Sequence, residues 1–125
     1  MNTDYLYSNI TEKIIGAVYK VYNTLGFGFL EKVYENALVI ELKKEGLDVR
    51  QQIPIKVHYE GKVIGDYIAD LIVEDKVIVE VKAVKRLDRV HETQLVNYLK
   101  AVNIEVGLLI NFGKKIEVKR KIFTQ

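Results

Sequence analysis

Two apolar runs, residues 67–73 and 77–82, lie within the stretch DYIADLIVEDKVIVEVK at residues 66–82. Three polar residues interrupt these runs: Asp70, Glu80 and Lys82. Runs rich in Ile and Val on both sides of residues 74–76 predict a β-hairpin. Strands this apolar are usually covered on both faces, so carboxylates and an ammonium inside them need a chemical reason. Two carboxylates beside an ammonium suit a divalent cation and a phosphate group. The hairpin is therefore the candidate site.

The placement of the two carboxylates depends on the length of the hairpin loop. With a three-residue loop, Asp70 lies directly opposite Glu80 and shares a face with it, about 5 Å apart at Cβ. Lys82 then follows on the same face, because alternate side chains along a strand point the same way. A two-residue loop would instead pair Asp70 with Val81 and send Glu80 to the opposite face.

Two carboxylates this close repel each other unless a cation lies between them or one is protonated. Mg²⁺ keeps several waters and takes one or two carboxylates plus phosphate oxygens, so Asp70 and Glu80 are the expected ligands, with the Val81 carbonyl as a further one. Such an ion promotes phosphodiester hydrolysis, in which Lys82 would position the water or stabilise the phosphoryl oxygens. We therefore predict a Mg²⁺ site, with Mn²⁺ as substitute, that would hydrolyse a phosphodiester.

The hairpin also resembles a known nuclease motif. Asp70, then nine residues, then Glu80-Val81-Lys82 resembles the PD-(D/E)XK nuclease signature, with Ala69 where that signature often has Pro. The resemblance implies a restriction-endonuclease-like α/β fold. It also implies catalytic roles for the two acidic residues and the lysine in the hydrolysis of nucleic acid, which we expect to be DNA rather than RNA.

Two further motifs extend the resemblance. Gln94 and Tyr98 are similar to the Q-x-x-x-Y of RecB-type members, and Gly28, Glu31 and Tyr34 are similar to the G-x-x-E-x-x-Y of a family of small PD-(D/E)XK proteins, from about residue 10 onward. This GxxExxY resemblance implies that Glu31 is an additional metal ligand. It implies that Gln94 and Tyr98 orient the site or touch the nucleic-acid backbone. Position alone would make Glu31 only a favourable charge at a helix N-terminus.

Hydrophobic periodicity and turn residues predict the elements that position these side chains. Asn9 with Glu12 suits a capping box for the first helix, and Asp88 can cap the last one. Pro54 predicts an edge position or a bulge for the first strand. The strand that holds Glu80 and the strand after the last helix form a βαβ unit, so they should be parallel and close together.

A restriction-endonuclease-like α/β fold in one domain over residues 1–125 is therefore expected. The second helix is predicted to bury a stripe that includes Leu30 and Val33, and Gly65 to mark a bulge. The expected elements are helices at about 9–25 and 30–45, antiparallel strands at 49–59, 62–73 and 77–82, a helix at 89–102, and strands at 106–110 and 116–123.

Composition excludes several other classes of protein. The 49% apolar and 29% charged residues are typical of an ordinary globular protein. The absence of cysteine excludes disulfides, zinc thiolate sites and iron–sulfur clusters. No signal peptide is visible and no segment approaches the roughly 20 apolar residues of a membrane span, so a cytoplasmic location without a membrane partner is expected.

Basic residues cluster at two places although the net charge is only +2. Lys85, Arg86 and Arg89 follow the hairpin, and a second cluster occupies residues 114–121. If the two clusters meet, they form a phosphate-binding surface, and we predict that the first three residues bind nucleic acid together with Tyr98. Otherwise they are solvated charges.

Three other interpretations stay open at this stage. Glu80 and Lys82 could form an exposed ion pair worth less than about 1 kcal/mol, with Asp70 interrupting an edge strand. The chain could be a non-catalytic nucleic-acid-binding or protein-interaction module that retains the fold, or a structural subunit that acts as a dimer with another protein. One metal site cuts one strand at a time, so double-strand cleavage would suggest a homodimer.

Overall fold

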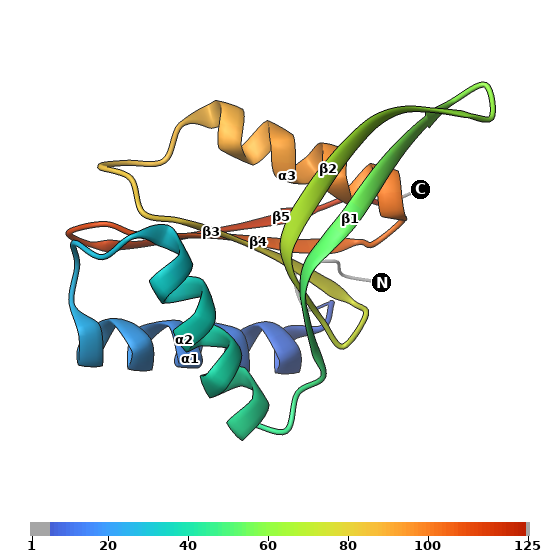
Figure 1. The fold of residues 1–125 in the computed structure, drawn as a ribbon. Helices are drawn as coiled ribbons and strands as arrows, with labels where there is room; N and C mark the ends of the chain where they lie inside the picture. The colour runs from blue at the N-terminus through green and yellow to red at the C-terminus, as the bar shows by residue number, and fades with distance from the viewer. Residues whose placement is uncertain (1–5, 125) are drawn as a thin grey trace.

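A five-stranded mixed sheet forms the centre of the structure, a computed structural model that describes residues 6–124 (Figure 1). The elements are α1 (Ser8–Leu25), α2 (Glu31–Lys44), β1 (Val49–Tyr59), β2 (Lys62–Val73), β3 (Val77–Lys82), α3 (Arg89–Val102), β4 (Val106–Phe112) and β5 (Ile116–Ile122). The strands lie in the order β1-β2-β3-β4-β5. Neighbours are antiparallel except β3 and β4, which are parallel.

The predicted order of elements is confirmed. Strand β3, which holds Glu80, lies beside β4 and parallel to it, as the βαβ unit requires. Strand β1 is an edge strand, which suits Pro54 because proline has no N–H to donate to a neighbouring strand. The register of β1 and β2 shifts where Gly65 pairs with Val57, so the bulge predicted there is also confirmed.

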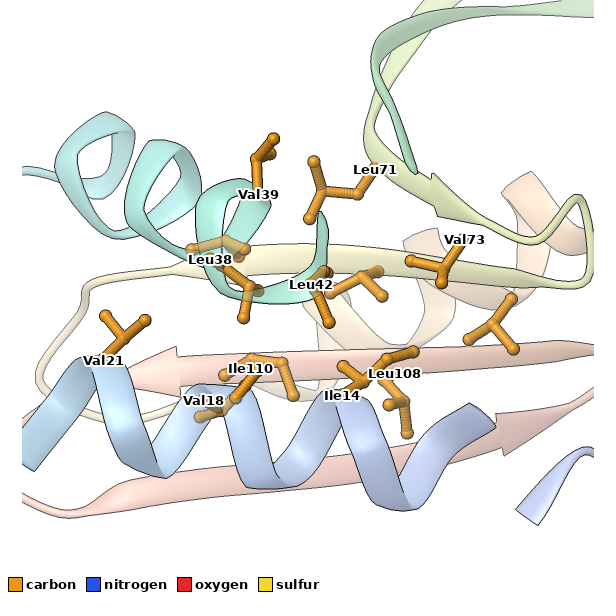
Figure 2. Packing of buried hydrophobic residues seen from close by; sticks show 14 of the residues in the cluster. Ile14, Val18, Val21, Leu38, Val39, Leu42, Leu71, Val73, Leu108 and Ile110 are labelled. Carbon is orange, nitrogen blue, oxygen red and sulfur yellow. The ribbon is translucent and has the colours of Figure 1, made fainter. Parts of the chain in front are cut away.

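Helices cover both faces of the sheet, which creates two cores (Figure 1). Strand β4 is buried along its whole length because both of its faces are covered. Helix α3 packs on one face over residues that include Ile72, Ile78 and Leu109. Figure 2 shows the other core, where Ile14, Val18 and Val21 of α1 and Leu38, Val39 and Leu42 of α2 pack against Leu71, Val73, Leu108 and Ile110 of the sheet.

Two predictions about the first two helices are wrong. The N-cap of α1 is Tyr7, in a left-handed conformation (φ 55) and without a side-chain cap, so the capping box of Asn9 and Glu12 does not form. Leu30 and Val33 are 80% and 39% exposed rather than buried. Leu30 is the extended N-cap residue of α2, and therefore lies outside the helical periodicity from which its burial was predicted.

The cap predicted for α3 is confirmed. The Asp88 side chain accepts a hydrogen bond from the backbone N–H of Val90 (3.2 Å), and the backbone N–H of Asp88 donates to His91 Nδ1 (3.1 Å). His91 therefore completes a capping box and needs no role in chemistry. None of the helices within residues 6–124 has the length and apolar content to cross a membrane.

Candidate active site

The β2–β3 hairpin brings the two predicted carboxylates together. Val73 pairs with Val77, so the three-residue loop is confirmed and the two-residue alternative is wrong. Backbone pairing continues from there for two more residue pairs and stops just before the next opposed positions, Asp70 and Glu80. The two strands therefore diverge at the acidic residues.

Each carboxylate accepts a backbone hydrogen bond from the other strand. The N–H of Asp70 donates to Glu80 Oε2 (2.7 Å), and the N–H of Val81 donates to Asp70 Oδ2 (2.8 Å). These crossed bonds fix both side chains at the point where the strands separate. Among residues 6–124, no group bonds to Glu80 Oε1, and Asp70 Oδ1 has only the Gln52 amide at 3.5 Å, the outer limit of a hydrogen bond.

The environment opposes the ionisation of both groups. Burial, followed by repulsion from Asp70, raises the pKa of Glu80 from 4.5 to about 8, and only 6% of this residue is exposed. Burial is also the main cause that raises the pKa of Asp70 from 3.8 to about 6, and the charges of Glu35 and Glu31 raise it further. A buried and a half-buried acid that repel each other can both ionise readily only when a cation is supplied.

Lys82 adds positive charge beside the pair without neutralising it. It is the last residue of β3, half-buried, and its charge lowers the pKa of both Asp70 and Glu80. Its ammonium forms no ion pair with any residue in the described range 6–124. The interpretation of Glu80 and Lys82 as an exposed ion pair is therefore wrong, because Glu80 is buried and the two side chains are not paired.

The loop before α2 carries Glu31 toward this site. Gly28 has φ 109, a conformation that glycine adopts without strain. The hydroxyl of Tyr34 donates to the Gly26 carbonyl (2.6 Å) and accepts from the N–H of Phe29 (3.2 Å), so it ties both ends of the loop to the helix. The three motif residues therefore act together: glycine shapes the loop, tyrosine anchors it, and Glu31 begins the helix.

The charge of Glu31 reaches the pair, since it contributes to the raised pKa of both Asp70 and Glu80. Within residues 6–124, however, no three His, Cys, Asp or Glu side chains are grouped closely enough to hold a metal ion. The two hairpin carboxylates alone fit Mg²⁺, which takes one or two carboxylates and keeps its other positions for water and phosphate. Ligation by Glu31 and by the Val81 carbonyl stays a prediction.

Glu35 is a site residue that sequence reasoning missed. It is 2% exposed and accepts hydrogen bonds from Lys32 Nζ (2.9 Å), Gln51 Nε2 (2.6 Å) and Gln52 Nε2 (3.0 and 3.1 Å). These donors allow a carboxylate to be buried between α2 and β1. The signal available in the sequence was its position one helical turn after Glu31, which places both carboxylates on one face of α2.

Gln52 was also missed, and it connects Glu35 with Asp70. It has φ 56, in the left-handed region that residues with side chains rarely adopt. It lies between the paired residues Gln51 and Ile53 and faces Asp70 across the β1–β2 ladder, which is interrupted there. Strand β1 therefore bends at Gln52, opposite Asp70, the residue at which β2 stops pairing with β3.

Helix α3 adds the other two predicted side chains. Gln94 Nε2 donates to the Tyr98 hydroxyl (2.9 Å). Tyr98 packs in the same core as Ala69, the residue before Asp70. Burial, followed by the charge of Glu80, raises the pKa of Tyr98. Tyr98 is only 6% exposed, and its ring lies 5.7 Å from that of Tyr67, centroid to centroid. The fold thus brings this motif to the hairpin site.

The predicted basic residues line two clefts. Lys85 and Arg86 are exposed and share a cavity of about 600 Å³ with Lys114. Arg89 lines a cleft of about 430 Å³ with Lys121. Each cleft is therefore lined by residues of both basic clusters, the one that follows the hairpin and the one at residues 114–121, although the clusters are far apart in the sequence.

The sheet topology, the two-sided helical cover and the acidic hairpin define a restriction-endonuclease-like α/β protein. The chain belongs to the PD-(D/E)XK nuclease superfamily, whose family model matches residues 8–122. Members of this superfamily are usually nucleases that use Mg²⁺ or Mn²⁺.

No curated protein matches the chain. Among solved structures, it is similar to the one titled "Crystal structure of SSO0001", with a TM-score of 0.61 and 22% sequence identity. The alignment covers 98% of this chain and 61% of that one, so the chain spans about three fifths of that protein's length. At this identity the likeness supports the fold alone.

Proposed function

We propose that this protein is a Mg²⁺-dependent nuclease that hydrolyses phosphodiester bonds of DNA, with RNA as the second substrate class. The observation that carries the proposal is the Asp70–Glu80 pair, a half-buried and a buried carboxylate held by crossed backbone hydrogen bonds and left without a neutralising partner in residues 6–124. The pair would hold the ion, with the Val81 carbonyl and Glu31 as further ligands. A bound divalent ion lowers the pKa of an attacking water and neutralises charge on the phosphoryl group.

The side chains around the pair would orient the phosphate and its water. Lys82 lies two residues beyond Glu80 on the same strand. Its ammonium, which forms no ion pair with any of residues 6–124, would stabilise the phosphoryl oxygens or position the water. Gln94, fixed by its hydrogen bond to Tyr98, would orient the attacking group or the backbone next to it. The side chains of the protein would therefore stabilise the charge of the phosphoryl group and position the reacting groups, without forming a covalent bond to the substrate.

The cations beyond the hairpin would bind the flanking phosphates. Lys85 and Arg86 lie on one side of α3's first turn and Arg89 begins that helix, in the two clefts described above. Contacts of this kind depend strongly on salt and carry little sequence information. We therefore expect recognition of nucleic-acid shape or ends rather than of a base sequence.

The loop geometry supports membership of the GxxExxY group within the superfamily. Gly28 shapes the loop, Glu31 begins α2, and Tyr34 ties the loop to that helix. The spacing of the motif therefore has a physical reason in this chain. We propose that Glu31 moves closer to the pair when the ion and the substrate phosphate are bound.

The test is a cleavage screen on end-labelled single-stranded DNA, duplex DNA and RNA, with Mg²⁺ or Mn²⁺ and with EDTA. Wild type should cleave at least one of them only with metal, and Asp70→Asn and Lys82→Met should lose at least about 100-fold in rate. Glu12→Gln, an exposed change on α1, is the matched control and should behave as wild type.

Two results would contradict the proposal. Equal cleavage by wild type and Asp70→Asn would place the activity elsewhere. Binding without metal-dependent cleavage of any substrate would favour the alternative, a non-catalytic nucleic-acid-binding module. Double-strand breaks would suggest a homodimer or two encounters, because residues 6–124 hold one acidic hairpin pair; sedimentation with and without substrate would reveal a homodimer.

A further inference from the structure

A cavity of about 740 Å³ lies between α3 and the outer half of the β1–β2 hairpin. Figure 1 shows this hairpin extending beyond the rest of the sheet and passing alongside α3. We call this space the α3 cavity. The residues of its lining that matter here are His58 and Tyr67 from the strands and Gln94, Asn97, Tyr98 and Lys100 from the helix.

The lining of the α3 cavity combines an aromatic face with unused polar groups. Tyr67 is 48% exposed, and its ring is tilted by 42° against that of Tyr98. The side chains of His58, Asn97 and Thr93 make no hydrogen bond with any of residues 6–124, so their donors and acceptors are available to a ligand. No carboxylate lines the cavity, whereas Lys100 does. The charge of the cavity lining is therefore positive, whereas the acidic pair is negative when ionised.

The α3 cavity shares two residues with the candidate active site. Gln94 and Tyr98 line the cavity and also belong to that site, and the charge of Glu80 acts on the Tyr98 hydroxyl. A polymer whose phosphate lies at the acidic pair would therefore extend a neighbouring unit into the cavity. The volume is within the range of about 300–1,000 Å³ that small-molecule sites occupy, enough for a nucleotide.

We propose that the α3 cavity binds an unpaired nucleobase of the nucleic acid whose phosphate lies at Asp70 and Glu80. Tyr67 stacks on the base and Asn97 bonds to its edge. A base in a duplex has both faces stacked and its pairing edge occupied, so only a single strand or an unpaired flank offers these groups. The inference rests on the proposed nuclease function and names its substrate class, single-stranded or locally unpaired nucleic acid.

Gly65 leaves room for the Tyr67 ring, so a side chain added there provides an indirect perturbation. A Cβ at Gly65 would lie 3.3 Å from Tyr67 Cε2 and 3.8 Å from Val57 Cβ. Gly65→Ala should therefore shift the ring without removing it. Its effect on binding should lie between that of wild type and that of Tyr67→Ala.

The test measures binding of a labelled single-stranded oligonucleotide by fluorescence anisotropy in EDTA, so that no cleavage occurs. Tyr67→Ala should bind about ten-fold more weakly, the usual effect of losing one stacking ring, and Tyr67→Phe should bind as wild type. Tyr19→Ala, which removes a 46% exposed tyrosine on α1, is the matched control. Circular dichroism confirms that each variant is folded.

A second arm places one abasic residue at each position of the oligonucleotide in turn. At one position the abasic residue should weaken binding to wild type as much as Tyr67→Ala weakens binding of the intact oligonucleotide. Tyr67→Ala should bind the oligonucleotide that is abasic at this position no more weakly than the intact one, because the stacking contact is already absent. Equal binding by wild type and Tyr67→Ala, in a protein that cleaves with Mg²⁺, would overturn the inference and leave the proposed function intact. If binding depends on the base and on Tyr67 but wild type cleaves no substrate, the proposed nuclease function is refuted and the proposed nucleobase site in the α3 cavity is retained. Failure to bind any oligonucleotide, both in EDTA and with a divalent ion, together with failure to cleave, would overturn both.

Discussion

Replacing Glu80 by Gln should stabilise the metal-free protein at neutral and alkaline pH. The amide keeps an oxygen that can accept the N–H of Asp70, now at 2.7 Å from Glu80 Oε2, but it removes the charge that burial disfavours. A carboxyl whose pKa is raised on folding stabilises the fold below its unfolded pKa, and this contribution is lost as pH rises to the folded pKa. For Glu80 that window runs from 4.5 to about 8.

The magnitude follows from the width of that window. A shift from 4.5 to about 8 corresponds to about 5 kcal/mol at about 1.4 kcal/mol per pKa unit. Backbone pairing ends just before Glu80, so the strands can relax when it ionises, and we expect about 2 kcal/mol. Glu80→Gln should therefore exceed wild type by about 2 kcal/mol in free energy of unfolding at pH 8, and by almost nothing at pH 4.

The assay is urea unfolding in EDTA at pH 4, 6 and 8, with Glu12→Gln as an exposed control. The difference between Glu80→Gln and wild type should grow with pH, while the control stays level with wild type. Adding Mg²⁺ should reverse the order at pH 8, because only wild type gains stability from the ion. A difference that is the same at every pH, or a variant that is less stable at pH 8, would refute the account of a strained acidic pair.

Three further predictions concern the site and its support. Mg²⁺ affinity, measured by calorimetry, should rise between pH 6 and pH 8. The ion must displace the protons of Asp70 and Glu80, whose pKa values are about 6 and about 8. An affinity that does not change over this pH range would contradict the prediction. Gln52→Gly should unfold with about 1 kcal/mol more stability than Gln52→Ala in denaturant titrations, because glycine tolerates φ 56; equal stability would contradict the strained bend. Gly107→Ala should cost about 1–3 kcal/mol in free energy of unfolding, because its Cβ would lie 2.9 Å from Leu95 Cδ1. Combining it with Leu95→Val should recover part of this loss, and a neutral single substitution would show that the contact is not tight.

Local patterns were enough to predict the acidic hairpin. Its two apolar runs and three intervening polar residues determined the register, and the register placed Asp70 near Glu80. Strand alternation then put Lys82 next to them. The end of backbone pairing at these residues could not be predicted, because it depends on the carboxylates accepting bonds from the opposite strand.

The parts of the site that the sequence did not reveal depend on contacts between distant segments. Glu35 has the pattern of an exposed helical residue until β1 brings Gln51 and Gln52 against it. The bend at Gln52 requires a positive φ that no glycine or asparagine signals. The α3 cavity, likewise, exists because the long β1–β2 hairpin passes over α3, and no periodicity encodes that path.

The most direct test of the central claim, that Asp70 and Glu80 form one divalent-cation site, is a calorimetric Mg²⁺ titration with a non-cleavable oligonucleotide bound. Wild type and the control Glu12→Gln should bind about one ion per chain at this site, whereas Asp70→Asn and Glu80→Gln should each abolish that binding. Equal stoichiometry and affinity in all four proteins would contradict the account, because the ion would then bind without the hairpin carboxylates.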